Sequence, residues 1–263
     1  MITLDTIDPA LYPWQSAHQA ELEAFFGDRL LRPLDDEEKE QLARLQVFLV
    51  TFTNRCGSNL LCNLLNRAGA GIPEASEPLN RTTALPLARE HGISTFTDYL
   101  LGYLTGWQRE GSVGIKIGPQ QLFWLRRTGL LSHSRQVVVV DCRRRDRLNQ
   151  AISHYLARAS GQWHSGMSAA EQDIPYSADE ILASLEDIGR GRELIERYLA
   201  IHQAACLPVD YEDVLENQEA ELARVAAFLG IELDGGVEPG LQKQAGRLNK
   251  AFRERFLEDF AGR

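Results

Sequence analysis

The chain has 263 residues, of which 44% are hydrophobic and 25% are charged, as in an ordinary globular protein with a core. Its formal net charge of −9 argues against general nucleic-acid binding, because a phosphate backbone requires a broad basic face. One local basic pocket is still compatible with this overall charge.

Several features of the sequence predict a cytoplasmic protein with no stable membrane insertion. Residues 1–12 contain two aspartates and no basic flank before an apolar stretch, which argues against a secretory signal. The longest apolar run, within residues 136–141, is much shorter than the roughly 20 residues that cross a bilayer. The cysteines form no C-x-x-C pair, which favours reduced thiols over a disulfide framework. They are Cys56, Cys62, Cys142 and Cys206.

The first 46 residues are predicted to form a lead-in of irregular chain and helices. Residues 14–26 are amphipathic, and the acidic run 35–40 marks the start of a second helix, where the helix dipole favours negative charge. An apolar run of β-branched and aromatic residues, 47–52, then predicts a buried strand. After a polar turn, residues 59–67 place four leucines on one helical stripe.

Strands and helices alternate along the rest of the chain. The clearest strand, 136–142, is apolar on both faces, as expected at the centre of a parallel sheet. We therefore predict an α/β fold with a central, mainly parallel sheet flanked by helices. The sequence has no repeat, low-complexity linker or clear boundary, so residues 1–263 are expected to form a single domain. Residues 81–110 are predicted to be helical, with a helix start near Thr95 or Thr97. The other predicted elements are strand 112–117, helix 120–127, helix 147–160, helix 179–201, strand 205–211, helix 217–229 and helix 241–260.

The first strand-to-helix junction has the residues of an anion cradle. Arg55 offers a guanidinium, Gly57 allows close approach to the backbone, and Ser58 and Asn59 add donors at a helix N-terminus. The phosphate loop of nucleoside triphosphatases requires G-x-x-x-x-G-K-[ST], and here the first glycine and the lysine are absent. These absences disfavour a magnesium-linked triphosphate site. Taken alone, the junction fits an ordinary turn with a capping Ser or Asn equally well.

A second junction follows the strand 136–142. Arg144 lies in the loop and Ser153 on the next helix, so both can bind the same phosphate. Arg144 would donate bidentate, charge-assisted hydrogen bonds, and Ser153 would add a neutral donor. Three consecutive arginines, residues 143–145, are more often a solvated surface patch. Their position directly after an apolar strand favours a site, because open α/β sheets bind ligands beyond the carboxyl ends of their strands. Two anion-binding junctions at the same edge of the sheet indicate a ligand with two separated phosphate-like groups.

Both junctions resemble motifs of one enzyme family. Residues 53–61, T-N-R-C-G-S-N-L-L, resemble the 5′-phosphosulfate loop of sulfotransferases, and residues 144–153, R-R-D-R-L-N-Q-A-I-S, resemble their 3′-phosphate motif. Both are most similar to the bacterial trehalose 2-sulfotransferase family. The resemblance spans roughly residues 47–255 and implies a P-loop sulfotransferase-like fold. Shorter similarities are Lys116-Ile-Gly118, Ser160-Gly-Gln-Trp163, Val209-Asp-Tyr-Glu-Asp213 and Phe228-Leu-Gly230.

The resemblance implies 3′-phosphoadenylyl sulfate as the donor and a hydroxyl of a carbohydrate, glycolipid or related metabolite as the acceptor. Arg144 and Ser153 would hold the 3′-phosphate. Sulfuryl carries less negative charge than phosphoryl, so arginine and backbone amides can suffice and no metal is expected. Transfer would be in line, with positioning as the main contribution of the protein, and a homodimer is implied. The 5′ group would be held by Asn54, Arg55, Cys56, Gly57, Ser58 and Asn59, with Arg55 also catalytic.

A glutamate is the implied general base. In the family it follows the first helix, and Glu77 in Ser-Glu-Pro-Leu-Asn matches that position, with Glu74 as the alternative. The alternative is that Glu77 has no chemical role and is simply a turn residue that precedes Pro78. The family usually has an aromatic residue after this glutamate, where this chain has Pro78 and Leu79. The acceptor therefore stays open.

Other side chains are weaker candidates. His154 and His164 could act as base or contact the acceptor, and Trp107, Trp124 or Trp163 could stack on a sugar or adenine, but surface and core positions are commoner for these residue types. Cys56 is read as a packing residue, and the histidine spacings suggest no metal set. Two other functions stay open, an ATP-dependent P-loop kinase and a non-catalytic nucleotide-binding protein.

Overall fold

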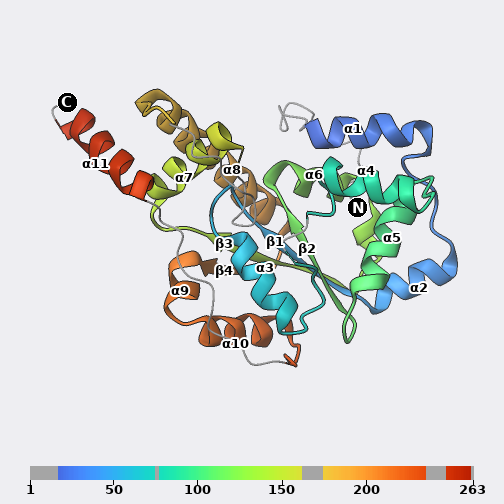
Figure 1. The fold of residues 1–263 in the computed structure, drawn as a ribbon. Helices are drawn as coiled ribbons and strands as arrows, with labels where there is room; N and C mark the ends of the chain where they lie inside the picture. Colours follow the sequence, from blue (N-terminus) through green and yellow to red (C-terminus); the bar gives the residue numbers. More distant parts are fainter. Residues whose placement is uncertain (1–16, 75–76, 162–173, 235–246, 262–263) are drawn as a thin grey trace.

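A parallel sheet of four strands forms the centre of the computed structural model, which describes residues 17–74, 77–161, 174–234 and 247–261 (Figure 1). The strands lie in the order β2-β1-β3-β4, so β1 pairs with β2 on one side and β3 on the other. This arrangement confirms the predicted α/β fold with a central parallel sheet. The strands are β1 (Gln46–Thr51), β2 (Ser112–Ile117), β3 (Gln136–Arg143) and β4 (Cys206–Asp210).

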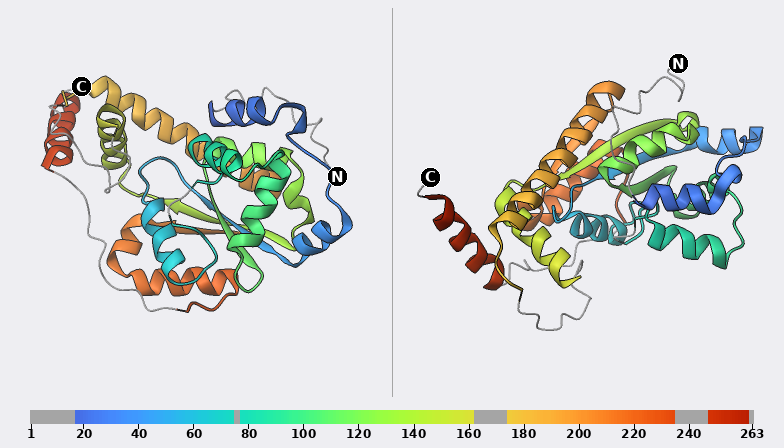
Figure 2. Two further views of the ribbon diagram at one scale, coloured as in Figure 1. Left: turned by 45° about the vertical axis from the view of Figure 1, so that its right-hand side comes forward. Right: turned by 90° about the horizontal axis from the view of Figure 1, so that it is seen from above.

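Helices cover both faces of this sheet (Figure 2). Side chains alternate between the faces along β1, because successive residues of a strand point to opposite sides. Val47 and Leu49 pack with helices α1, α2, α4, α5, α6 and α8, whereas Phe48 and Val50 pack with α3, α9 and α10. Every residue of β1 is buried, which explains why the sequence of this strand is almost continuously apolar.

The helices follow the predicted pattern closely, and the short helix α9 is one that the sequence did not predict. The helical stretch 81–110 is two helices, α4 and α5, separated at residues 91–95. Thr95, one of the two predicted helix starts, caps α5 by accepting a hydrogen bond from the Asp98 amide. Residues 162–173 and 241–246 lie outside the described residues. The helices are α1 (Ala17–Phe26), α2 (Asp36–Arg44), α3 (Ser58–Arg67), α4 (Arg81–Glu90), α5 (Phe96–Trp107), α6 (Pro119–Arg127), α7 (Arg147–Ser160), α8 (Ala178–His202), α9 (Tyr211–Glu216), α10 (Gln218–Leu229) and α11 (Arg247–Ala261).

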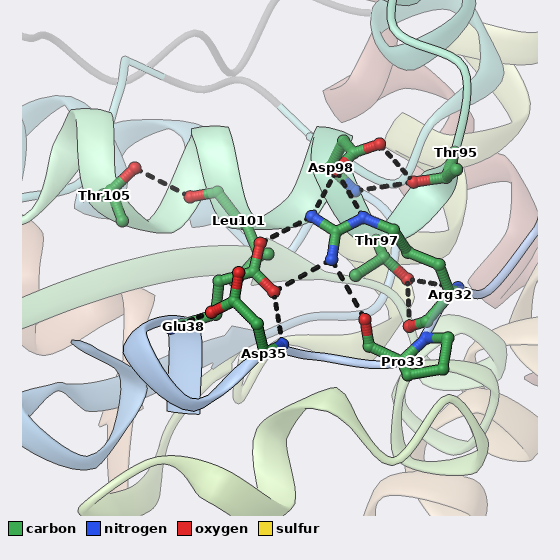
Figure 3. A network of polar contacts seen from close by, with 9 residues as sticks. All are labelled: Arg32, Pro33, Asp35, Glu38, Thr95, Thr97, Asp98, Leu101 and Thr105. Carbon is green, nitrogen blue, oxygen red and sulfur yellow. Dashed lines mark hydrogen bonds and ion pairs between the residues drawn. The ribbon is translucent and has the colours of Figure 1, made fainter. Parts of the chain in front are cut away.

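Arg32 ties the segment that precedes α2 to helix α5 (Figure 3). Its Nε donates to Asp98 at 2.8 Å, and its Nη1 donates to Glu38 at 2.9 Å. Glu38 also closes a capping box with Asp35 at the start of α2. The Arg32 hydrogen bond lowers the pKa of Glu38 to about 2. The acidic run therefore begins a helix, as predicted, and one of its carboxylates also fixes the preceding chain.

A third apolar cluster lies beyond the sheet, among α7, α8 and α11. Ile152 and Tyr155 of α7 pack with Ile181 and Ile188 of α8 and with the phenylalanines of α11. Helix α8 therefore packs both in this cluster and in the core on one face of the sheet, where Leu194 and Tyr198 lie. None of the helices in the described part of the chain is long and apolar enough to cross a bilayer.

Candidate functional site

The turn after β1 has a backbone that only a few residue types adopt. Arg55 has φ of 63° and Gly57 has φ of 98°, both in the left-handed region. A Cβ at position 57 would lie 2.2 Å from Cδ2 of Tyr211, so no side chain fits there. Gly57 is the N-cap residue of α3 and has no side chain to cap the first amides of the helix. N–H groups at a helix N-terminus are suited to binding an anion.

Replacing Gly57 with alanine is expected to destabilise the fold by about 1–3 kcal/mol, because the methyl group overlaps the ring of Tyr211. Urea unfolding measures this change. Gly129→Ala is the matched control, since Gly129 has φ of 73° and nothing lies within 4 Å of the point that its methyl group would occupy. Equal midpoints for the two variants would contradict the close approach.

The two predicted anion-binding junctions, one at Arg55 and the other at Arg144 and Ser153, are in direct contact. Nε of Arg55 donates to Oγ of Ser153 at 3.0 Å, and Nη1 of Arg144 donates to the carbonyl of Arg55 at 3.2 Å. The guanidinium of Arg144 also lies 5.1 Å from the ring centroid of Tyr211. The carboxyl ends of β1 and β3 thus bring together residues that are 98 and 89 positions apart.

Two residues of α7 fix the loop that precedes Arg55. The buried amide of Gln150 donates to Oγ1 of Thr53 at 2.9 Å and to the carbonyl of Asn54 at 2.8 Å. Nε2 of His154 lies 3.3 Å from Nδ2 of Asn54. Burial lowers the pKa of His154, so its imidazole is neutral at pH 7. Gln150 was not among the predicted site residues, although the motif containing Arg144 and Ser153 includes it.

A buried lysine, Lys116, connects Glu77, the predicted general base, to α3, the helix that follows the loop at Arg55. Nζ of Lys116 on β2 donates to Oε1 of Glu77 at 3.0 Å and to Oδ1 of Asn59 on α3. Only 3% of the Lys116 side chain is exposed, against 26% of Glu77. Lys116 was not among the predicted site residues either. A lysine inside a buried strand was the sequence feature that could have identified it.

Glu77 and the loop after β1 border one cleft of about 470 Å³. Glu74 is exposed and does not line this cleft. Of the two glutamates that the sequence left open as general base, only Glu77 therefore borders the cleft. The walls come from α1, α6, α7 and α8, as well as from the end of β1. The polar lining residues are His18, Thr53, Asn54, Glu77, Gln120, Gln121, His154, Asp187 and Arg190.

Helix α8 is anchored to the sheet by a buried ion pair. Arg192 donates from both terminal nitrogens to Asp141 of β3, at 2.7 and 2.8 Å. Thr51 and Arg143 also donate to Asp141, whose side chain is fully buried. Burial alone would raise the pKa of Asp141, but the hydrogen bonds and charges of Arg192 and Arg143 hold it below its ordinary value. The strand predicted to be apolar thus contains an ionised aspartate.

Cysteine and tryptophan side chains that the sequence singled out are mostly part of the packing. Cys56 is buried in the apolar cluster around α3, and burial raises the pKa of the neighbouring Cys62 thiol to about 12. Trp124 fills the core, and Trp107 is 41% exposed at the end of α5. The side chains of Trp163 and His164 lie outside the described residues. In the described ranges, no three His, Cys, Asp or Glu side chains are grouped to hold a metal ion.

Comparisons with known proteins relate the second half of the chain to one family. Residues 132–259 match the model of the Stf0 sulphotransferase family. This range includes Arg144 and Ser153 but does not extend to the loop at Arg55. A crystal structure of a sulfotransferase from Alicyclobacillus acidocaldarius is similar over 82% of this chain and 91% of that chain, with 16% identity and a TM-score of 0.43. No curated protein matches the chain.

Proposed function

We propose, from the match of residues 132–259 to the Stf0 sulphotransferase family, that the protein transfers a sulfuryl group from 3′-phosphoadenylyl sulfate to a hydroxyl of a carbohydrate, glycolipid or related metabolite. The contact between Arg55 and Ser153 is the observation that carries this proposal. It joins the two anion-binding junctions at one sheet edge, as a ligand with a 5′-phosphosulfate and a 3′-phosphate requires.

The charges around Arg55 support an anionic ligand. Burial, together with the like charge of Arg144, lowers the pKa of Arg55, although a guanidinium remains protonated in proteins. Nε of Arg144 is buried and has no hydrogen-bond partner among the described residues. An anion between the two guanidinium groups would offset their repulsion and accept the missing hydrogen bond.

Each junction has a separate role in the proposed reaction. Arg55 and the amides around Gly57 bind the 5′-phosphosulfate, with Asn54, Cys56, Ser58 and Asn59 forming the rest of that loop. Arg144 and Ser153 bind the 3′-phosphate. Guanidinium and amide donors stabilise the charge that develops on the leaving phosphate, so Arg55 contributes to the reaction as well as to binding.

Glu77 is the proposed general base. It takes the proton of the acceptor hydroxyl as the hydroxyl oxygen bonds to sulfur, while the bond from sulfur to the 5′-phosphate oxygen breaks. Adenosine 3′,5′-bisphosphate leaves and the acceptor becomes a sulfate ester. Glu77 lines the same cleft as Asn54 of the proposed donor loop, and this supports the role. The cleft is the proposed acceptor site.

Thermal-shift titration tests the donor assignment. Adenosine 3′,5′-bisphosphate is expected to raise the unfolding temperature without magnesium and more than ATP does, because a ligand of the folded state stabilises it. Transfer of labelled sulfuryl to a panel of saccharides and glycolipids tests the reaction. A preference for ATP with magnesium would favour a P-loop kinase, and tight bisphosphate binding without transfer would favour a non-catalytic nucleotide-binding protein.

Replacing Arg144 with glutamine is expected to weaken binding of the bisphosphate by about 10- to 100-fold, the loss of hydrogen bonds to a charged group. Calorimetric titration gives the dissociation constant. Arg145→Gln is the matched control, because Arg145 is an exposed neighbour paired with Asp210 and Asp213. Equal affinities of the two variants would remove Arg144 from the nucleotide site.

We also propose that residues 1–263 act as one domain, with residues 1–46 as its helical lead-in, and that the protein works in the cytoplasm as a homodimer. The packing of α1 and α2 against the same core as α4 and α5 supports the first part. Light scattering in solution measures the oligomeric state, and a monomer at micromolar concentration would contradict the dimer.

A further inference from the structure

Lys116 lies at the end of the sheet where both ligands of the proposed reaction would bind. It pairs in register with Val50 of β1, close to the point where that strand leads into the loop at Arg55. Its side chain is almost completely buried. A buried ammonium is costly unless nearby groups compensate its charge, so the contacts of Lys116 are held tightly.

Those contacts extend in two directions. Nζ donates to Oε1 of Glu77 on the acceptor side and to Oδ1 of Asn59, which is in the first turn of α3, on the donor side. The ammonium also lies 4.7 Å from the centroid of the Phe52 ring, whose face attracts a cation. One side chain therefore touches the proposed base, the proposed donor loop and the end of β1.

Glu77 depends strongly on this lysine for its position. Its second carboxylate oxygen receives a hydrogen bond from Nδ2 of Asn80, at a long 3.4 Å. The contact to Lys116 is shorter and charge-assisted, and such bonds are roughly twice as strong as neutral ones. The ammonium also attracts the ionised carboxylate, which is the form that can accept a proton.

We propose that Lys116 is a positioning residue, which holds the ionised carboxylate of Glu77 at a fixed place relative to the first turn of α3. This inference rests on the proposed function, because it concerns the base of that reaction. The geometry explains how the base and the donor loop keep their alignment although they come from separate segments. Asn59 serves as the fixed point on the donor side.

A double-mutant cycle on kcat tests the role. With donor and acceptor saturating, Lys116→Met is expected to lower kcat by about 100-fold, as misplacement of a catalytic group by about 1 Å does. In the Glu77→Gln background the same substitution should change kcat by less than about threefold, because the base is already lost. A structural role alone would reduce kcat equally in both backgrounds, and that result would overturn the proposal.

Lys39→Met is the matched control, because Lys39 is 42% exposed and pairs only with the neighbouring Asp36 among the described ion pairs. It should leave kcat unchanged. A second readout needs no activity: the amide of Asn80 donates to the carbonyl of Glu77 at 2.9 Å. Hydrogen exchange of this amide should become about tenfold faster in Lys116→Met than in Lys39→Met.

The two proposals fail in different ways. If the unmodified protein transfers no sulfuryl group to any acceptor, the proposed function fails, and exchange at Asn80 alone decides whether Lys116 positions Glu77. If transfer occurs but Lys116→Met changes neither the exchange rate nor kcat, the proposed function stands and the positioning role is overturned.

Discussion

Glu77→Gln is expected to lower kcat for sulfuryl transfer by about 100- to 10,000-fold, the contribution of a well-placed general base. Glutamine keeps the shape of the side chain and can still accept a hydrogen bond from Lys116, but it cannot take the proton of the acceptor hydroxyl. Affinity for adenosine 3′,5′-bisphosphate should change by less than about threefold, because in the proposed reaction the Arg55 and Arg144 junctions hold the nucleotide and Glu77 does not contact it.

Glu74→Gln is the control for this variant. Glu74 precedes Glu77 by three residues, is exposed and lies outside the cleft, so its substitution should leave kcat within about twofold of the unmodified protein. Single-turnover rates with labelled donor separate the chemical step from product release. Undiminished single-turnover transfer by Glu77→Gln would transfer the role of base to another group, of which His154 is a candidate in the same cleft.

Local patterns predicted the elements of the fold well. The strand 112–117 and the helix 147–160 were predicted with the boundaries that the structure has, because β-branched runs and helical apolar stripes are local properties. The helix start within 81–110 has a local cause too. Thr95 accepts a hydrogen bond from the Asp98 amide and starts a new helix, at one of the two positions, Thr95 or Thr97, where the sequence predicted a start.

The candidate site was only partly predictable. The junctions at Arg55 and Arg144 could be found because small residues and arginines directly follow apolar strands, and parallel strands end at one edge. Their direct contact could not be found, since it joins positions about 90 residues apart. Lys116 and Gln150 were given no role, although both lie in stretches that the sequence analysis singled out, because each one contacts a segment that is distant in the sequence.

The pair formed by Arg192 and Asp141 was missed for the same reason, and its loss should have the largest effect on stability. Arg192→Met is expected to lower the free energy of unfolding by about 3–5 kcal/mol, because it leaves the buried Asp141 charge without its main partner. Urea unfolding at pH 7 measures this value. Arg197→Met is the control, since Arg197 pairs with Glu193 on the surface of α8 and should cost less than about 1 kcal/mol.

The stability lost in Arg192→Met should become smaller as pH falls. In the unmodified protein the pKa of Asp141 is lowered, so its ionised form stabilises the fold above the unfolded pKa of about 3.9, and this contribution disappears as pH falls through the lower folded value. In Arg192→Met only Arg143 and Thr51 still oppose the effect of burial, so the pKa of Asp141 is higher than in the unmodified protein and the carboxyl is protonated at a higher pH. The difference between the two proteins should therefore shrink from pH 7 to pH 4.

Asp141→Asn in the Arg192→Met background separates charge from packing. Because it removes the buried charge, it should recover part of the lost stability at pH 7 and abolish most of the pH dependence of the difference. The cleft gives a functional readout of the same pair, since α8 contributes Asp187, Arg190 and Gly191 to its wall. If Arg192→Met unfolds at the same urea concentration as Arg197→Met, then apolar packing alone holds α8 against the sheet, and the wall of the cleft does not depend on this ion pair.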